Sequence, residues 1–236
     1  AEGEVVSARA SRVAGGFALE GKKTHVAFAD DAGLVLAPFL LEGEVAVFVI
    51  DPRAEGVLID REESLDFTRP SCRVVFSGAR VPEGALLAKS SREAWEDLTR
   101  RGAALLAAET VGIAEALLQK TRDYANNREQ FGRKIGSYQA VKHPIVDMMI
   151  QIEEARSLAY AAAAAFDASS SDAARLAHAA KARASEASSF AARKAVQLHG
   201  GHGFTFECDV HYWFRRALAS RATLGDELQH RNALAA

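Results

Sequence analysis

The sequence has only two cysteines among its 236 residues, Cys72 and Cys208. They lie far apart in the chain and form no CxxC pair, so their spacing supports neither a disulfide framework nor a redox motif. No metal site is predicted from the sequence. We interpret both thiols as reduced, and this indicates a cytoplasmic protein.

The sequence also lacks an excess of either charge, a long apolar run and a signal peptide. The 29 basic and 31 acidic residues leave a formal charge of −2, which gives no electrostatic reason to expect binding to nucleic acid or to an anionic membrane. No apolar run reaches the roughly 18 residues of a membrane span, and the N-terminus lacks a basic stretch followed by an apolar one. With 25% charged and 49% hydrophobic residues, the composition is that of a soluble globular protein with one or two domains.

Short β-branched runs alternate with turn residues from Val5 to about Leu87. Leu41-Glu42-Gly43-Glu44 separates two apolar stretches, and Asp51-Pro52 follows the second of them. This pattern is typical of strands joined by tight turns. We therefore predict a small antiparallel β-domain over residues 1–90.

After Ser90 the composition changes to alanine, leucine, glutamate and lysine with a helical period. Helices are predicted over residues 93–127, 138–167, 172–199 and 226–235. The breaks fall at Phe131–Gly136, at Ser169-Ser170-Ser171-Asp172, a run suited to an N-cap, and at the glycines of 200–203. Three long helices rich in alanine, which permits close helix approach, predict a bundle over residues 91–236. The predicted fold class is α+β.

Two motifs far apart in the chain carry residues suited to anion recognition. The first runs from Arg128 to Gln139 (REQFGRKIGSYQ), and the second runs from Gln197 to Phe204 (QLHGGHGF). In the first, a guanidinium can bind a phosphate while an aromatic ring packs beside it and a glycine lets the backbone pass closely. In the second, a Gly-Gly-x-Gly run after a helix can expose backbone N–H groups to a pyrophosphate. Either motif alone also arises in helix ends and turns, whereas the two in this order are specific.

Together the two motifs resemble the C-terminal signatures of the acyl-CoA dehydrogenase family, and the resemblance extends from about Val13 to the C-terminus. Members are FAD-dependent enzymes that desaturate acyl-CoA thioesters between the α and β carbons. The resemblance implies a middle β-domain and a C-terminal helical domain, with the usual N-terminal helical domain absent. A fragment and a naturally short subunit are both compatible with this absence. The residues that it assigns to the ADP half of FAD are Arg128, Phe131, Gln139, Gln197, Gly200 and Gly201.

The resemblance also bears on the catalytic base, a carboxylate that removes the α proton of the thioester. Family members carry it at the position of Leu224, in the C-terminal segment, or of Gly102, on the helix that opens the C-terminal domain. Neither residue can accept a proton. Glu109 and Asp226 are the nearby carboxylates, but we interpret Glu109 as an interhelical hydrogen-bonding group and Asp226 as the cap of the last helix. The base is therefore unassigned.

The positions that the resemblance assigns to the flavin ring are altered too. Family members carry an aromatic residue and a Thr or Ser in a β-domain strand, whereas His25 and Ala27 stand there in this chain. We interpret His25 as a surface or packing residue. The chain therefore keeps the residues for the ADP half of FAD and lacks those for the ring.

An obligate partner would explain this asymmetry, because in the family the ADP end of FAD is held by the C-terminal domain of a neighbouring subunit. We predict an α2β2 heteromer in which a homologous subunit supplies the base, acting on an acyl-CoA and passing electrons to an electron-transfer flavoprotein or a similar acceptor. The segment from His199 to Asp226 resembles heteromeric members of actinobacterial steroid catabolism. The alternatives are a self-sufficient homo-oligomeric dehydrogenase with its base at an unusual position and a flavin-free structural or binding protein. No motif identifies the acyl group as fatty, branched or steroid.

Overall fold

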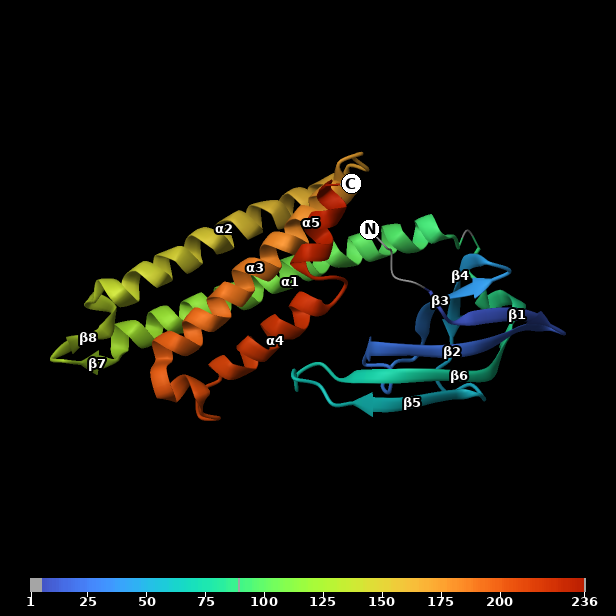
Figure 1. The fold of residues 1–236 in the computed structure, drawn as a ribbon, viewed down its shortest axis with the longest axis horizontal. Coiled ribbons are helices and arrows are strands. Elements are labelled where there is room, and N and C mark those ends of the chain that lie inside the picture. Colours follow the sequence, from blue (N-terminus) through green and yellow to red (C-terminus); the bar gives the residue numbers. More distant parts are fainter. Residues whose placement is uncertain (1–5, 89, 236) are drawn as a thin grey trace. The chain divides into compact units, whose positions relative to one another are not determined.

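The structure is a computed structural model that describes residues 6–88 and 90–235, so Val5, the first residue of the expected strand pattern, lies outside the described residues. The chain forms two compact units, one up to Leu98 and one from Thr99 onward. Figure 1 shows strands in the first unit and long helices in the second. Each unit has its own hydrophobic core.

A six-stranded sheet makes up most of the first unit, with its strands in the order β4-β3-β1-β2-β6-β5. The strands are Arg9–Val13 (β1), Gly16–Ala27 (β2), Val35–Leu41 (β3), Glu44–Ile50 (β4), Val57–Glu62 (β5) and Ser71–Pro82 (β6), and a short 3-10 turn, η1, follows at Glu83–Ala85. The tight turn predicted at Glu42-Gly43 joins β3 to β4, and both turn residues have positive φ.

The prediction of a purely antiparallel sheet is wrong for one pair of strands. β1 and β3 run parallel, with Arg9 opposite Leu40, and the other neighbouring strands of the sheet are antiparallel. The strand order explains the difference: β2 has β1 on one side and β6 on the other, so β3 joins the sheet at the remaining edge of β1. Residues 28–34 carry the chain back to that edge, and the sheet is mixed.

Aromatic rings form the centre of the sheet unit. Phe17, Phe39, Phe48 and Phe76 are fully buried and pack edge to face, with ring centroids 5.1 to 5.7 Å apart. Such pairs contribute about 0.5–1.5 kcal/mol each beyond the burial of their area. The four rings come from β2, β3, β4 and β6, so the cluster ties together strands that are not neighbours in the sheet.

The helices that form the second unit are α1 (Arg92–Asn127, which begins in the first unit), α2 (Gln139–Asp167), α3 (Ala173–His199), α4 (Val210–Ala222) and α5 (Glu227–Ala235). The predicted bounds of α1, α2, α3 and α5 agree with these to within one residue. No prediction covered α4. Its apolar residues stand side by side as Tyr212-Trp213-Phe214 rather than three or four apart, so the helical period is hidden.

Asp172 lies at the N-cap position of α3, but its side chain does not cap the helix. Its own backbone is already helical, with φ −80° and ψ −7°, whereas a capping residue usually adopts an extended conformation. The carboxylate instead accepts a hydrogen bond from Arg175 at 3.2 Å. The prediction placed the start of α3 correctly, but the Asp172 side chain does not cap the helix as predicted.

Alanine dominates the core of the helical unit, and Ala114, Ala155 and Ala184 are fully buried on three different helices. Small side chains let these helices approach closely along their length. α1 is long and apolar enough, by length and composition, to cross a membrane, and this qualifies the expectation from the sequence. Half of its apolar window is buried within the structure, as in the core helix of a soluble protein.

Candidate functional site

The first motif forms a short hairpin at the end of α1. Its strands are β7 (Glu129–Gln130) and β8 (Arg133–Lys134). They are joined by Phe131 and Gly132, whose φ angles are 53° and 76°. Lys134 secures the hairpin, because its ammonium donates to the Asn127 carbonyl at 3.0 Å. A cation at the C-terminus of α1 also interacts favourably with the helix dipole. Arg128 is thereby held at the point where the helix ends.

The second motif lies where α3 ends and the 3-10 turn η3 (Gly200–Phe204) begins. Gly200 has φ 61° and ψ −143°, a conformation that is essentially restricted to glycine, and its backbone N–H caps α3 on the Gln197 carbonyl. A Cβ atom built on Gly200 or Gly201 would meet no protein atom within 4 Å. The backbone of this pair is therefore open to the close approach of a ligand.

The two motifs meet in one cavity of about 630 Å³. Four residues predicted to bind the cofactor line it: Arg128, Gln197, Gly200 and Gly201. Phe131 and Gln139, which were predicted with them, do not line it, since Phe131 is 91% exposed at the tip of the hairpin and Gln139 is the first residue of α2. The other lining residues are Tyr124, Gln130, Ile135, Leu198, His199 and His202.

Three rings in the wall of the cavity had no predicted role. Tyr124 stacks on His199, with ring centroids 4.3 Å apart, and on His202, with centroids 6.0 Å apart. The sequence contains a signal for each ring. Tyr124 lies one helical turn before Arg128 and so faces the same side of α1, and both histidines lie inside the glycine motif.

His199 is buried at the end of α3, and its Nδ1 lies 2.8 Å from the Ala195 carbonyl oxygen. A carbonyl only accepts hydrogen bonds, so Nδ1 carries the proton and Nε2 carries a lone pair in the neutral ring. Burial lowers the pKa of His199 and outweighs the opposite effect of the bond to Ala195. The ring is therefore a neutral acceptor at pH 7.

The two residues at the positions expected for a base, Leu224 and Gly102, lie against each other. A Cβ atom on Gly102 would be 3.0 Å from Leu224 Cδ1. Leu224 also has φ 56°, a left-handed conformation that costs a residue other than glycine about 1 kcal/mol or more. A hydrocarbon contact between α1 and the turn from α4 to α5 therefore fills the place that the resemblance assigns to a carboxylate.

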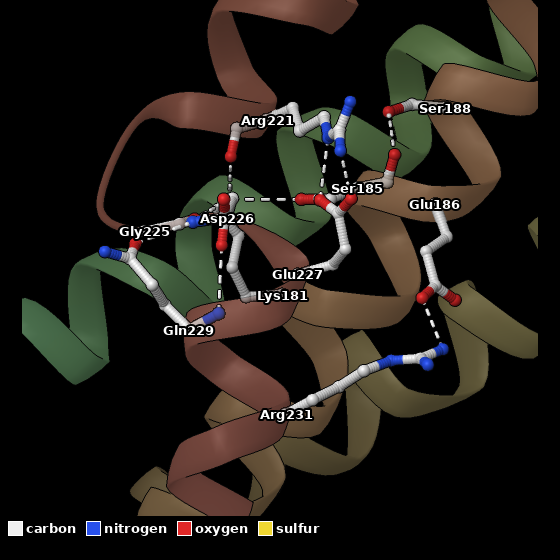
Figure 2. A network of polar contacts seen from close by, with 10 residues as sticks. All are labelled: Lys181, Ser185, Glu186, Ser188, Arg221, Gly225, Asp226, Glu227, Gln229 and Arg231. Atoms are coloured by element: carbon white, nitrogen blue, oxygen red, sulfur yellow. Dashed lines mark hydrogen bonds and ion pairs between the residues drawn. The ribbon is translucent and has the colours of Figure 1, made fainter. Parts of the chain in front are cut away.

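A buried lysine on α3 holds the turn that carries Leu224 (Figure 2). Lys181 is fully buried, and its ammonium donates to Ser185 Oγ at 3.1 Å, to the Arg221 carbonyl at 3.1 Å and to the Gly225 carbonyl at 2.8 Å. All three N–H donors thus have oxygen partners, as a buried charge requires.

Burial lowers the pKa of Lys181 to about 8, although the nearby carboxylates of Glu227 and Asp226 oppose the shift. Glu227 is itself bound to Arg221, whose Nε donates to it at 2.7 Å. The charges around the turn therefore form a connected network between α3, α4 and α5, as Figure 2 shows.

Two histidines hold the same turn from the other side. His230 Nε2 lies 2.9 Å from the Leu224 carbonyl oxygen, and His230 Nδ1 lies 2.8 Å from His178 Nδ1. Because the carbonyl only accepts, His230 carries its proton on Nε2, and His178 Nδ1–H donates to His230. Burial lowers the pKa of His230 to about 4 and also lowers the pKa of His178. Both rings are neutral at pH 7.

Glu109 and Asp226 both have structural partners. Arg216 of α4 donates to Glu109 Oε1 at 3.0 Å, so Glu109 forms the interhelical hydrogen bond expected from the sequence. Asp226 caps α5: its Oδ1 accepts the Gln229 backbone N–H at 2.9 Å, and the Gln229 side chain accepts the Asp226 N–H at 3.1 Å.

His25, at the position expected for a ring-packing aromatic, lies in an irregular part of β2 with φ 56°. Its side chain is 84% exposed, and its Nδ1 lies 3.2 Å from Glu62 Oε2. The backbone N–H of His25 donates to the same carboxylate oxygen at 3.0 Å. This agrees with the interpretation of His25 as a surface residue. Ala27 is the last residue of β2.

The mixed sheet followed by a bundle of long helices is also found in solved acyl-CoA dehydrogenases, such as glutaryl-coenzyme A dehydrogenase, with a TM-score of 0.90. The chain belongs to the acyl-CoA dehydrogenase family, because the family's C-terminal domain matches residues 96–236. It is 47% identical to the acyl-CoA dehydrogenase IpdE2 of Mycobacterium tuberculosis over 122 residues, which cover 52% of this chain and 36% of that protein. It is 30% identical over 212 residues to CarC, a subunit of the caffeyl-CoA reductase-Etf complex of Acetobacterium woodii, and this match covers 84% of the chain and 55% of CarC.

Among solved structures, the chain resembles the ChsE4-ChsE5 complex of Mycobacterium tuberculosis with a TM-score of 0.91 and 26% identity. That match covers 100% of this chain and 63% of the chain in the complex. The chain therefore spans between about a third and two thirds of the length of these relatives.

Proposed function

We propose that this chain is a subunit of an FAD-dependent acyl-CoA dehydrogenase, that it holds the ADP half of FAD, and that a dissimilar partner subunit supplies the catalytic base. One observation carries the proposal: the helical unit gathers Arg128 and the Gly200–Gly201 backbone in one cavity but has hydrocarbon at both base positions, Leu224 and Gly102. In this proposal residues 1–90 are the middle β-domain, and residues 91–236 provide the FAD site and the oligomer interface.

The residues of the cavity fit an ADP group. Arg128 offers a guanidinium to a phosphate, and the backbone at Gly200 and Gly201 has open space around it, so a phosphate can approach it closely. The volume of about 630 Å³ lies within the usual range for small-molecule sites. The wall of the cavity also contains polar and aromatic side chains that could contact a nucleoside, namely Gln197, Tyr124, His199 and His202. When bound, FAD supplies the oxidant that takes up the two electrons removed from the α–β bond.

The place of the base in this chain cannot take part in proton transfer. Leu224 and Gly102 present hydrocarbon, which excludes water and holds no proton, so the carboxylate that removes the α proton must come from elsewhere. Glu109 and Asp226 are engaged with Arg216 and with the N-terminus of α5. A partner with an intact base would complete the site.

The relatives support an assembly of this kind. ChsE4-ChsE5 is a complex of two named proteins, and CarC is a subunit of a complex with Etf. By analogy we propose a homologous partner in an α2β2 heteromer, an electron-transfer flavoprotein or similar acceptor, and a CoA thioester substrate, with a steroid-type acyl group as one candidate. The proposed location is cytoplasmic.

The cofactor assignment is tested by flavin retention in the complex isolated with its partner. Arg128→Ala should weaken FAD binding by on the order of 1.5–3 kcal/mol, because it removes a charge-assisted contact to phosphate. Gln197→Ala should act in the same direction but more weakly. Arg122→Ala, an exposed arginine outside the cavity, is the matched control. The measurement is the visible absorbance of bound flavin after dialysis.

If Arg128→Ala and Gln197→Ala both keep full flavin occupancy, the cofactor assignment is wrong. Expression of this chain without a partner tests the second part of the proposal. A yellow, active homo-oligomer from one gene would contradict the shared site and favour a self-sufficient enzyme.

A further inference from the structure

His199 offers the cavity a hydrogen-bond acceptor. Its Nδ1 is committed to the Ala195 carbonyl, and Tyr124 stacks on its ring at 4.3 Å, so Nε2 is the polar atom left for a ligand. Within residues 6–88 and 90–235, Nε2 has no hydrogen-bond partner in the protein. It is also accessible to solvent, unlike the fully buried polar atoms that lack a partner. The residue as a whole is only 6% exposed and lines the cavity, so a ligand reaches Nε2 from there.

Burial, more than the neighbouring charges, keeps the His199 ring neutral. Burial is the main cause of its lowered pKa, and Lys120 of α1 and His202 of η3 lower it further, whereas Asp209 acts in the opposite direction. Tyr124 is the titratable residue stacked on the ring. Phosphate oxygens at neutral pH only accept hydrogen bonds, and the lone pair on Nε2 repels them. A histidine beside a Gly-Gly pair would ordinarily be assigned to the phosphates, but this ring suits a donor instead.

We propose that His199 Nε2 accepts a hydrogen bond from the nucleoside part of the ADP group, either from a ribose hydroxyl or from the adenine amino group, and so recognises the nucleoside rather than the phosphates. This rests on the proposed function of the cavity. Arg128 and the glycine backbone then bind the phosphates, and His199 acts as a specificity determinant in the same cavity.

Calorimetry on the flavin-free protein tests the proposal from the ligand side, with the partner subunit present where the two are isolated together. The probes are ADP, 2′-deoxy-ADP, 3′-deoxy-ADP, inosine diphosphate and inorganic pyrophosphate. One nucleotide that lacks the recognised donor should bind about 5- to 10-fold more weakly than ADP, the usual effect of one hydrogen bond. The identity of that nucleotide distinguishes the ribose hydroxyls from the adenine amino group. Equal affinity for all four nucleotides would overturn the proposal without any variant.

His199→Phe tests it from the protein side, because it keeps a ring to stack on Tyr124 and removes Nε2. The variant should bind ADP about 5- to 10-fold more weakly, should no longer distinguish ADP from the weak analogue, and should bind pyrophosphate as the wild type does. His143→Phe, an exposed histidine of α2 outside the cavity, is the matched control. Weakened pyrophosphate binding by His199→Phe would make His199 a phosphate ligand and refute the proposal.

Failure of the proposed function gives a different result. In that case neither ADP nor pyrophosphate binds to the wild type, and the cavity is not a nucleotide site at all.

Discussion

At the scale of single residues, Lys181 is the least expected side chain in the fold. A lysine is rarely fully buried, because removing its charge from water is costly unless hydrogen bonds and nearby charges offset the loss. Here three oxygen partners and the carboxylates of Asp226 and Glu227 offset only part of it, and the pKa falls to about 8. The buried charge of the lysine therefore costs free energy, yet its removal would leave two partly buried carbonyls without their donor.

Lys181→Met should lower the free energy of unfolding by about 2 kcal/mol at pH 7. The methionine fills the space and relieves the cost of the buried charge, but the partly buried Arg221 and Gly225 carbonyls both lose their donor, and each unsatisfied acceptor costs about 1–3 kcal/mol. Denaturant unfolding monitored by circular dichroism measures the change. Lys194→Met, on the half-exposed side of the same helix, should have little effect. A Lys181 variant as stable as the wild type would show that the network does not stabilise the turn.

The same comparison should depend on pH, with a sign fixed by the direction of the shift. The pKa of Lys181 is lower in the folded state, about 8, than its ordinary value of 10.5. Between these pH values the unfolded chain binds the proton and the folded chain does not, so wild-type stability rises with pH relative to Lys181→Met. From pH 8 to 9.5 the difference should grow by about 1.6 kcal/mol, somewhat less than 1.36 kcal/mol per pH unit because the folded lysine is still half protonated at pH 8. A difference that stays constant would show that the lysine titrates normally.

At the scale of elements, the turn between α4 and α5 is fixed from several directions. Lys181 of α3 binds its carbonyls, His230 of α5 binds the Leu224 carbonyl, and Asp226 caps α5 immediately after it. These contacts hold Leu224 in its left-handed conformation against Gly102 of α1. This contact gives a reason for glycine at position 102, because the Cβ atom of any other residue there would crowd the Leu224 side chain.

A double-mutant cycle can measure this contact. Glycine in a helix interior is worse than alanine by roughly 0.5–1 kcal/mol, so Gly102→Ala should stabilise α1, but the new Cβ at 3.0 Å from Leu224 Cδ1 should cancel the gain. In a Leu224→Ala background the gain should appear in full, giving a coupling energy of about 0.5–1 kcal/mol in chemical denaturation. Gly112→Ala, also on α1 and with open space around it, should show no coupling to Leu224. Additive effects at positions 102 and 224 would show that the two residues do not touch in solution.

The elements also show what the sequence could predict. The ends of α1, α2, α3 and α5 could be predicted, because runs of glycine, serine and aspartate separate long alanine-rich segments. The helix α4 was not, because its aromatic residues are adjacent in sequence, and the parallel pair of β1 and β3 was not, because strand order is a property of the whole sheet.

The cavity could be predicted in part, because some of its residues belong to motifs that the sequence shows. Arg128 and Gly200 belong to recognisable motifs, and the fold brings them together. The acceptor role of His199 depends on its bond to Ala195 and on burial, and the contact of Gly102 with Leu224 joins distant segments. Tertiary packing determines both, and no local pattern encodes them.

At the scale of the whole molecule, the chain keeps residues suited to one part of the expected site and lacks those suited to the rest. The helical unit gathers Arg128, Gln197 and the Gly200–Gly201 pair in one cavity, whereas the base positions hold hydrocarbon and the ring-packing position holds an exposed histidine tied to Glu62. A chain that retained every part of the site would have no need of a dissimilar subunit. The asymmetry supports the proposal that a partner supplies the missing chemistry, and the remaining carboxylates of this chain can be tested against that proposal.

Glu109→Gln and Asp226→Asn should leave turnover nearly unchanged in the reconstituted complex, measured as dye-linked oxidation of an acyl-CoA. Both variants preserve structure: glutamine keeps an oxygen for Arg216 at position 109, and asparagine is as good an N-cap as aspartate at position 226. A true general base contributes typically 10²–10⁴-fold, so its loss would be unmistakable. Flavin content is measured in parallel, so that a lost cofactor is not mistaken for lost chemistry. A collapse of the rate with flavin still bound would identify that carboxylate as the base, and the chain would then be a self-sufficient enzyme.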